Sequence, residues 1–467
     1  MRRLIYIFII GLLLCSYTWA DGSRYASKSL LSEGKWVKIR VDKTGIYKLS
    51  YADLKNMGFS DPSKVSVHGY GGWPLDEDFS KEYIDDVPST PVWRGSDYLL
   101  FYGKGPVKWE YDSSSQTFVH TNNPYSLYGY YFVTDATPTN DMTSVAQASG
   151  ATNRITTYDD YLVHEQELVS LAKSGRELYG EDFSGATPRT LSTFSSIPGI
   201  TNEDAKVTMS FVSKVTSGTG VASLSINQSN VLDVSIRSNR EEYVKALEGV
   251  STAVWKGEKS EKNSVVVSYN SASHNNVRLN YVRLHFKRTL QPYGAYTFFR
   301  SIASIGNVSR FVVQGANANT LVFDVTDAQR VRLMETELNG SELTFSIPAG
   351  TLREFVLVRT DQSFISPEVV GEVENQNLHA LEQKDMIIIA AKAFQTQAER
   401  LAEEHRATDG LTVEVVDPQS IYNEFSSGAP DATAYRRFMK MFYDRSVSAG
   451  NAPKYLLLFG DGIYDNR

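Results

Sequence analysis

The amino-terminal part of the chain is patterned as strands. Val37, Ile39 and Val41 recur at every second position, the period of a strand with one buried face. The segment 42–45 (Asp-Lys-Thr-Gly) has turn chemistry, and apolar residues return over 46–49. We therefore expect these two runs to pair as a hairpin.

One helix and four further strands are expected before residue 135. The helix covers 51–57 and stops at Gly58. The strands are expected over 64–70, 97–102, 117–120 and 128–134. The stretch from 135 to 153 is rich in Thr, Ala, Ser and Asn, which is typical of a linker. Together these patterns predict a β-rich domain over 21–150.

A second β-rich domain is expected over 151–380. Its strongest strand patterns lie at 206–215, 222–226, 264–269, 277–288, 320–325 and 352–358. The spacing is irregular, but turn residues recur between the runs, which favours a β-sandwich.

The pattern changes near residue 384, where continuous apolar runs alternate with segments of helical period. Such runs are typical of strands buried on both faces. Strands are expected over 385–391, 411–416 and 455–459, and helices over 394–406 and 432–446. This order predicts the first half of a doubly wound parallel α/β domain over 384–467. A three-stranded sheet with a bare edge is an aggregation liability, so we expect a fragment cut within this domain.

Composition narrows the class of protein. The chain has 467 residues, about three domains in length. Its 42% hydrophobic and 22% charged residues exclude wholesale disorder and a polytopic membrane protein. A net charge of −7 provides no basic field, so we expect no nucleic-acid partner. The 27 Tyr and 22 Phe residues suit pleated, half-buried surfaces and support β-rich domains.

The first 20 residues have the pattern of a secretory signal peptide. Arg2 and Arg3 precede an apolar run over 4–14, and 18–20 (Thr-Trp-Ala) resembles a cleavage site. Cys15, the one cysteine of the chain, lies in this segment. A lipoprotein signal is the weaker alternative, because it needs a small residue where Leu14 stands. The mature chain then has no cysteine for a disulfide, a thiolate metal site or a nucleophile.

Functional groups of an open α/β sheet lie at the carboxyl ends of its strands. Here Asp461, between two glycines, follows the last strand. One interpretation is an acidic group near an active site, or an oxygen ligand for Ca²⁺ together with Asp465 and Asn466. Turn and helix-capping chemistry is the favoured alternative.

Other candidates are weaker. None of the seven histidines has a partner at the spacing of a helical metal site, so each is expected to be an exposed or core residue. The acidic residues between Asp76 and Asp86 lack the spacing of a calcium loop and predict a solvated loop. The glycine-rich segment 68–72 is followed by no helix that could bind phosphate, and predicts a turn.

Two motifs of the α/β region resemble a known family. They are 426–438 (Ser-Ser-Gly-Ala-Pro-Asp-Ala-Thr-Ala-Tyr-Arg-Arg-Phe) and 455–462 (Tyr-Leu-Leu-Leu-Phe-Gly-Asp-Gly). They are similar to the opening of the gingipain-type cysteine peptidase domain, which has a caspase-like fold. Upstream motifs at 34–39, 44–49, 100–109, 123–126 and 174–183 resemble the amino-terminal region of such proteins. The resemblance covers nearly the whole chain.

The resemblance implies a cysteine thiolate, paired with a histidine, that forms an acyl-enzyme and needs no cofactor. Within the family it is closest to a sortase of the bacterial type IX secretion system. That activity removes the carboxy-terminal secretion domain of cargo proteins and joins them to anionic lipopolysaccharide. It implies outer-membrane components of the same system as partners, and a place on the surface of a Gram-negative cell.

The chain departs from the family at its catalytic residues. The family's histidine and cysteine follow later strands, so no catalytic residue lies within this chain, and we expect the chain itself to have no peptidase activity. The alternative is a non-catalytic β-domain surface or adhesion protein with a degenerate α/β tail.

Overall fold

The computed structural model describes residues 24–171, 175–185, 187–215, 217–238, 246–271, 274, 276–446, 450–462 and 466. The predicted signal peptide and its Cys15 lie outside these residues. In the part of the chain that the structure describes, no helix is long and apolar enough to cross a membrane.

The chain forms two compact units, each assembled from segments distant in sequence. The first contains the described residues within Met1–Lys38, Leu75–Pro88 and Glu372–Gly462, and the second contains those within Ile39–Pro74 and Ser89–Gly371. Because these units are discontinuous, they do not test the predicted intervals 21–150, 151–380 and 384–467, which stay predictions.

Three small sheets contain the strands of the amino-terminal third. A five-stranded sheet has the order β27 (Glu368–Val373), β1 (Trp36–Val41), β9 (Gly129–Thr134), β3 (Ser66–His68), β4 (Ser89–Thr90). A three-stranded sheet has the order β2 (Gly45–Ser50), β6 (Tyr98–Gly103), β5 (Val92–Arg94), and β7 (Val107–Asp112) pairs with β8 (Thr117–Asn122). The expected strands are therefore present, with shifted ends.

The predicted hairpin at 36–49 is wrong. Strands β1 and β2 form where the alternation places them, but β2 pairs antiparallel with β6, with Gly45 opposite Gly103, and β1 lies in another sheet. Both strands are buried over most of their length. A strand with two apolar faces buries more apolar surface in a sheet that is covered on both sides than in a two-stranded hairpin, and is therefore more stable there.

Helix α2 (Tyr51–Asn56) follows β2 directly and agrees with the helix expected there. The Ser50 hydroxyl accepts a hydrogen bond from the Asp53 amide, and the Asp53 carboxylate accepts one from the Ser50 amide. This reciprocal capping box satisfies two amides that the first turn would leave unpaired.

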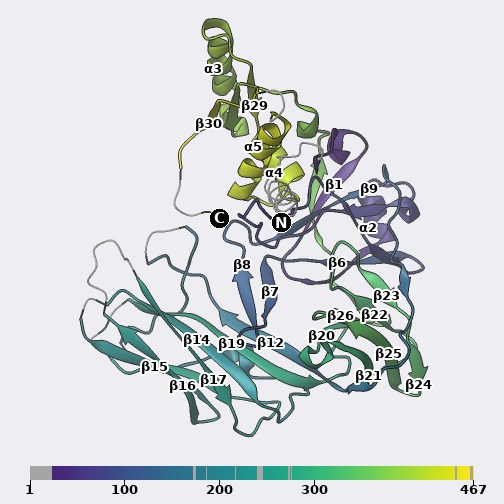
Figure 1. Ribbon diagram of the computed structural model, residues 1–467, viewed down its shortest axis with the longest axis vertical. Helices are drawn as coiled ribbons and strands as arrows, with labels where there is room; N and C mark the ends of the chain where they lie inside the picture. Colours follow the sequence, from purple (N-terminus) through teal and green to yellow (C-terminus); the bar gives the residue numbers. More distant parts are fainter. Residues whose placement is uncertain are drawn as a thin grey trace, which may run out of the picture. The chain divides into compact units, whose positions relative to one another are not determined.

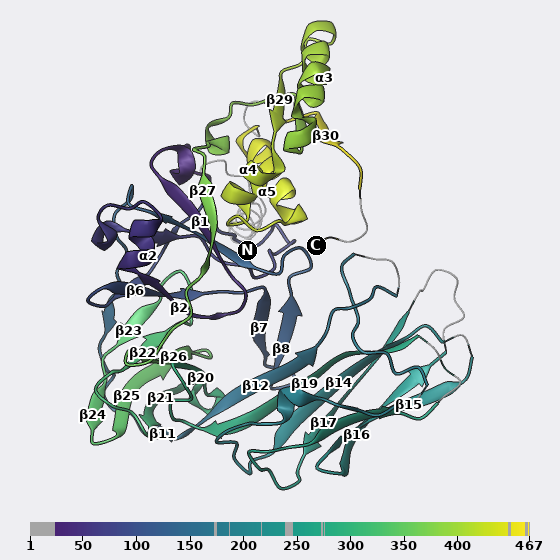
Figure 2. The ribbon, with the colours of Figure 1, turned by 180° about the vertical axis from the view of Figure 1, so that it is seen from behind.

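The second β-rich region consists of one nine-stranded sheet covered by two smaller sheets (Figure 2). The large sheet has the order β10 (Ser144–Val145), β23 (Arg332–Met334), β22 (Thr320–Asp324), β26 (Glu354–Arg359), β20 (Tyr296–Arg300), β12 (Thr157–Glu165), β19 (Val277–Thr289), β14 (Ala205–Ser213), β17 (Leu247–Trp255). The smaller sheets are β11 (Asn153–Ile155), β21 (Asn307–Val313), β25 (Glu342–Ala349), β24 (Glu337–Asn339), and β13 (Arg189–Thr190), β18 (Val265–Tyr269), β15 (Thr219–Ile226), β16 (Ser229–Arg237).

Two separate hydrophobic cores lie under these sheets. Side chains of β14 and β19 pack against those of β15, β16 and β18 in one core, and β20, β22 and β26 pack against β21 and β25 in the other. The rings of Phe311 and Phe345 stack 5.0 Å apart in the second core. The expected sandwich architecture is thus present, in the form of two sandwiches that share one sheet.

The first unit contains a parallel three-stranded sheet in the order β29 (Val413–Val416), β28 (Met386–Ala390), β30 (Tyr455–Phe459). Ile387 and Ile389 pack against α4 (Pro418–Phe425) and α5 (Ala432–Ser446). The alternate residues of β28 pack against α3 (Gln395–Thr408) on the other face. Helices therefore cover both faces, as a doubly wound sheet requires (Figure 1).

Two details of this unit differ from expectation. Helix α4 was not predicted, although Asp417 caps it and Pro418 occupies its first position, which are helix-start signals. Strand β30 is largely exposed rather than buried, with Leu458 58% exposed, whereas β29 at the other edge has no exposed residue.

The amino ends of the three strands are joined by one carboxylate. Asp385 accepts hydrogen bonds from the Thr412 amide, at 2.9 Å, and from Lys454 Nζ, at 2.8 Å. Thr412 directly precedes β29, and Lys454 directly precedes β30. These side-chain hydrogen bonds therefore fix the alignment of the three strands at this end, in addition to the backbone hydrogen bonds between the strands.

Candidate functional site

Functional residues of an open parallel sheet are expected at the carboxyl ends of its strands. Strand β28 has β29 on one side and β30 on the other, so the loops after β28 and β30 lie at a topological switch point. Asp461 lies there, directly after Gly460, and is exposed. Its carboxylate accepts a hydrogen bond from the Gly462 amide at 2.8 Å. Asp465 lies outside the described residues, so its pairing with Asp461 and the binding of Ca²⁺ stay predictions.

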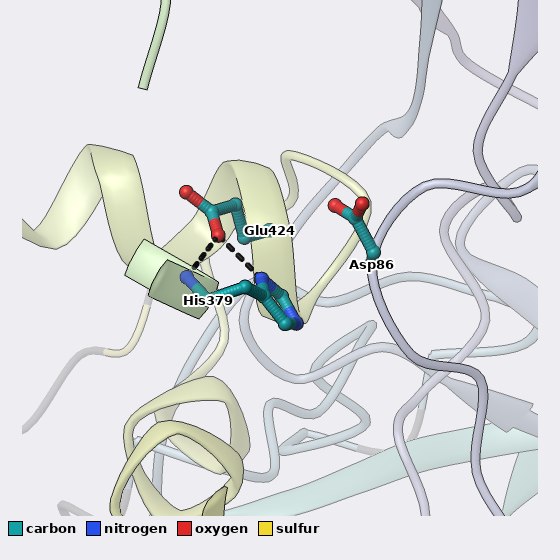
Figure 3. Close-up of side chains that lie close together, drawn as sticks. All are labelled: Asp86, His379 and Glu424. Carbon is teal, nitrogen blue, oxygen red and sulfur yellow. Dashed lines mark hydrogen bonds and ion pairs between the residues drawn. The ribbon is translucent and has the colours of Figure 1, made fainter. Parts of the chain in front are cut away.

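A different group of side chains is brought together by the fold of the same unit. Among the described residues, Asp86, His379 and Glu424 form a cluster whose nitrogen and oxygen atoms lie within 4.8 Å of one another (Figure 3). His379 lies in a 3-10 turn (Leu378–Ala380), Glu424 in the last turn of α4, and Asp86 in the segment Leu75–Pro88. All three are buried.

The Glu424 carboxylate is held by four N–H groups. Its Oε1 accepts hydrogen bonds from the Leu378 amide and from Gln376 Nε2, both at 2.8 Å. Its Oε2 accepts hydrogen bonds from the His379 amide, at 3.1 Å, and from His379 Nδ1, at 2.5 Å. A buried carboxylate with this many donors is stable in its charged form.

His379 bridges two carboxylates. Its Nε2 lies 3.1 Å from Asp85 Oδ1, and its ring stacks on Phe425 with centroids 4.7 Å apart. Burial alone would lower the pKa of His379, but the hydrogen bonds and charges of Asp85 and Glu424 outweigh it and raise the pKa to about 9. The imidazole is therefore protonated at neutral pH.

The protonation state of His379 decides whether this cluster can bind a metal ion. A histidine binds a metal ion through an unprotonated nitrogen, and here both ring nitrogens face carboxylate oxygens as donors. The arrangement thus fits a buried imidazolium between two carboxylates, and it would fit a cation only after His379 had lost its proton.

Asp86 faces the amino-terminal segment of the same unit. Its carboxylate accepts hydrogen bonds from Ser29 Oγ, at 2.8 Å, and from the Leu30 amide, at 2.7 Å. Burial raises the pKa of Asp86, and these two donors oppose that effect. The Asp85 carboxylate likewise accepts the Ala26 amide at 2.8 Å. The segment that follows the predicted signal peptide is therefore bound by Asp85 and Asp86, and His379 links Asp85 to Glu424 of α4.

A second polar group joins the same segments. The Tyr25 hydroxyl donates to Asp444 Oδ2 at 2.7 Å, and Lys440 donates to the same carboxylate. Burial, followed by its hydrogen bonds to Tyr83 and Asp444, raises the pKa of Tyr25. Arg445 donates to the carbonyls of both Ala26 and His379 at 2.8 Å. The amino-terminal segment is thus held by two neighbouring side chains, Asp444 and Arg445, in the last turn of α5.

Sequence reasoning missed this site. The histidines and the acidic segment up to Asp86 were interpreted separately, as core or exposed histidines and a solvated loop, and the second interpretation is wrong for Asp85 and Asp86. One local signal was present: Glu424 lies on the face of α4 that also carries Ile421, so a carboxylate on an apolar helix face marks a buried ion pair. No local pattern links that residue to Asp86.

Comparison with known proteins shows what the chain is similar to. Residues 379–467 match the model of peptidase family C25. A crystal structure of dimeric latent PorU from Porphyromonas gingivalis superposes with a TM-score of 0.88 at 34% sequence identity, over 95% of this chain and 43% of that chain. This chain is PorU-like.

Other matches add nothing to this assignment. An uncharacterized protein from Listeria monocytogenes matches 54% of the PorU-like chain and 19% of its own, at 8% identity and a TM-score of 0.18. A cycloisomaltooligosaccharide glucanotransferase from a Paenibacillus species matches 45% of each chain, at 7% identity and a TM-score of 0.17. These scores are too low to support an argument about the fold. A comparison with curated proteins gave no match.

The likeness to PorU has two consequences. The PorU-like chain spans 43% of the length of the PorU chain it matches, so the activity of the longer protein is a proposal for this one. The C25 match begins at His379, which means that the buried imidazolium lies where the peptidase-type domain starts.

Proposed function

We propose that this chain is the amino-terminal part of a secreted cysteine endopeptidase of the sortase type. That enzyme would remove the carboxy-terminal secretion domain from type IX cargo proteins and attach them to surface lipopolysaccharide. The observation that carries the proposal is the similarity to PorU over 95% of this chain at 34% identity, supported by the C25 match over 379–467.

In this proposal the chain contributes the first strands and helices of the catalytic domain but not its catalytic residues. The family mechanism uses a cysteine thiolate that attacks a peptide carbonyl, after which water or an amine resolves the acyl-enzyme. Residues 21–467 contain no cysteine, so no catalytic residue is assigned within them. The three strands β29, β28 and β30 would be the platform from which later strands extend.

The chain's own polar network would set the position of that platform. His379, Glu424 and Asp85 hold the amino-terminal segment against α4 through buried charge. A fixed α4 in turn supports β28, because Ile421 packs with Ile387 and Ile389 in one core. Catalytic groups built on rigid elements are held more precisely than groups on loops.

The partners follow from the same resemblance and are part of the proposal. They are cargo proteins with a carboxy-terminal secretion domain, outer-membrane components of the type IX system and anionic lipopolysaccharide. The predicted signal peptide over 1–20 supports export to the cell surface of a Gram-negative bacterium. No cofactor is required by the mechanism, and Ca²⁺ at Asp461 and Asp465 is retained as a separate prediction.

The second candidate function is a non-catalytic surface or adhesion protein whose α/β tail is degenerate. The extent of the β-rich part favours it, since six of the seven sheets lie outside the parallel three-stranded sheet among the described strands. The coding sequence downstream of Arg467 separates the two. A His-Gly pair and a later Cys, each after a strand, support the enzyme.

Deletion of the coding sequence in the organism that makes this protein tests the proposal. We expect cargo proteins to keep their secretion domain and to lack lipopolysaccharide, measured by mass spectrometry of cargo carboxyl termini and by immunoblot. Complementation with the complete gene restores processing, and complementation with the gene carrying Ala at the family's cysteine does not. Cargo that is processed normally in the deletion strain would overturn the proposal.

A further inference from the structure

A chain of hydrogen bonds in the second unit joins a hydroxyl group, an imidazole and a carboxylate. Oγ1 of Thr193 lies 2.9 Å from Nδ1 of His164. On the other side of the ring, Nε2 of His164 lies 2.6 Å from Oε1 of Glu181. A hydroxyl within hydrogen-bond reach of a base, which a third group orients, is the arrangement of an activated nucleophile. All three residues lie outside the C25 match over 379–467, so the proposed peptidase activity does not account for them.

The histidine and the carboxylate lie beside the centre of the nine-stranded sheet. His164 is the next-to-last residue of β12, where it is opposite Val282 of β19. The Glu181 carbonyl accepts a hydrogen bond from the Leu279 amide of β19 at 3.1 Å. One strand, β19, therefore fixes the backbone of both residues. Functional groups on such regular structure are held more precisely than groups on loops.

The threonine lies at the surface, in a short turn that the core anchors. Thr193 is the middle residue of the 3-10 turn Ser192–Phe194. Leu191 before it and Phe194 after it are buried in the core that β14 and β19 share with β15, β16 and β18. Thr193 itself is exposed. Packing of its neighbours thus fixes the turn while the threonine stays open to solvent.

The base and the carboxylate are shielded from water, in contrast to the threonine. His164 is 8% exposed, and the side chain of Glu181 is 14% exposed. Water therefore competes little for the hydrogen bonds of the imidazole, which are stronger in such surroundings than in solvent. A reagent in solution meets Thr193 first, with its base directly behind it.

The charge of Glu181 determines how the imidazole is oriented. Burial raises the pKa of this carboxyl group, but the hydrogen bond from His164 leads the opposing effects, and the pKa lies below its ordinary value. The charged carboxylate can only accept hydrogen bonds. The hydrogen between the two side chains therefore belongs to Nε2 of His164, and in the neutral ring Nδ1 has a lone pair. That lone pair faces the Thr193 hydroxyl, as a general base requires.

We propose that Thr193 is a nucleophile that attacks small esters, with His164 as its general base and Glu181 as a positioning residue. Oγ1 of Thr193 attacks the ester carbonyl carbon, and its proton passes to Nδ1 of His164. The alcohol leaves with that proton, and the acyl group stays on Oγ1. Water then attacks the acyl group, its proton passes to Nδ1, and the acid leaves as Thr193 recovers its hydrogen. The sum is one ester and one water giving one acid and one alcohol.

Esters are the expected class of substrate, because an alcohol leaves more readily than the amine of a peptide. The order of groups is that of a serine-hydrolase triad. Here, however, Nδ1 rather than Nε2 faces the nucleophile. The reaction uses none of the residues of the C25 region, so its presence or absence leaves the proposed sortase function untouched.

The test is reaction of the purified chain with p-nitrophenyl acetate, followed by peptide mass spectrometry to locate the acetyl group. We expect a burst of nitrophenolate and an acetyl ester on Thr193. A fluorophosphonate, which forms a stable adduct and releases fluoride, should label the same residue. Thr190 of β13 is the internal control, because it is exposed but has no hydrogen bond to a histidine among the described residues. An unmodified Thr193 in samples quenched during the burst, or equal acetylation of Thr190, would overturn the inference.

Variants assign the roles of the first two residues. Thr193→Val removes the hydroxyl group at an exposed position and should abolish the burst, whereas Thr190→Val should keep it. His164→Ala should slow acetylation of Thr193 by about 100-fold or more, the contribution of a general base. Added imidazole should restore part of that rate, which it would not do if His164 only supported the fold. A burst that survives in Thr193→Val would refute the assignment of the nucleophile.

The role of Glu181 has its own readout. Glu181→Gln keeps an acceptor of similar shape but removes the charge, and should lower kcat for ester hydrolysis while KM stays nearly the same. Loss of structure would instead change both constants together with the melting temperature. Unchanged rates in both His164→Ala and Glu181→Gln, with melting temperatures near that of the parent, would refute the site.

Discussion

Nδ1 of His379 lies 2.5 Å from Oε2 of Glu424, and the two residues are 45 positions apart in the sequence. This contact, with Asp85 on the opposite side of the ring, makes His379 a buried cation. Its charge links the segment Leu75–Pro88 to the last turn of α4 within one unit.

Stability should fall at alkaline pH because of His379. The pKa of His379 in the folded state is about 9, above the ordinary histidine pKa of 6.5, so the folded state binds the proton more tightly. The stabilisation is complete below about pH 6.5 and is lost as the pH rises through 9. It amounts to about 3 kcal/mol at most. Denaturant unfolding of the parent and of His379→Gln at pH 6 and pH 10 measures it. The variant should lose this part of the pH dependence, and His405→Gln, a control at a half-buried position near the end of α3, should keep it.

Lys38 should have the opposite effect. Its Nζ donates to the Gly428 carbonyl at 2.7 Å, and burial lowers its pKa to about 7. The unfolded state therefore binds more protons between about pH 7 and 10, and stability rises with pH there by about 1.4 kcal/mol per unit. Lys38→Met should abolish this rise in denaturant unfolding. Lys55→Met, at an exposed position of α2, is the control, and equal pH profiles for the parent and Lys38→Met would contradict the prediction.

The amino-terminal segment should loosen when Asp86 is removed. Asp86→Ala leaves Ser29 Oγ and the Leu30 amide without their acceptor, at a cost of about 1–3 kcal/mol. Hydrogen exchange of residues 26–31 should accelerate, while exchange in the β-rich unit stays the same. Asp78→Ala, exposed in the same segment, should leave exchange unchanged. Equal protection in Asp86→Ala and the parent would show that the carboxylate does not hold the segment.

Gly129 should tolerate no side chain. A Cβ added there would lie 2.0 Å from the Lys104 carbonyl oxygen and 2.8 Å from the Gly72 amide, both backbone atoms. Gly129→Ala must displace β9 and should destabilise the chain by about 3 kcal/mol or more. Gly350→Ala meets nothing within 4 Å and serves as the control. Similar melting temperatures of the two variants would count against the close approach.

Cargo cleavage by the chain itself should be undetectable. Residues 21–467 provide no thiolate nucleophile, since Cys15 is the one cysteine of the sequence. Incubation of the purified chain with a cargo protein that carries its secretion domain, followed by mass spectrometry, measures this. The matched control is a longer protein that includes the downstream strands. Cleavage by the chain above a protein-free blank would refute the prediction.

Local pattern was sufficient for most elements of the fold. The apolar run at Met386–Ala390 and the helical period at Ala432–Ser446 became β28 and α5 with nearly the expected bounds. Such elements are defined by their own side chains. The partner of a strand is not, which is why β2 formed as expected but paired with β6 rather than with β1.

The buried cluster could not be predicted for the same physical reason. The charge of His379 is stabilised by Asp85, which lies 294 residues away in the sequence. A lone histidine and an acidic loop each have ordinary explanations when considered alone. Their combination depends on tertiary packing, which spacing along the chain does not encode. The three-stranded platform, in contrast, follows from its pattern, and so does the place of Asp461 at its carboxyl edge.

The strand order of the nine-stranded sheet also limits when one of its edges can form during synthesis. Ser144 in β10 pairs with Leu333 in β23, so this edge of the sheet cannot close until 189 further residues have been made. At about 5–20 residues per second that takes about 10–40 s, and pairings of such long range form slowly. During this interval β10 has no partner strand in the sheet. The order of synthesis therefore leaves β10 without its partner strand for this interval, while β12, β14, β17 and β19 can already pair with one another.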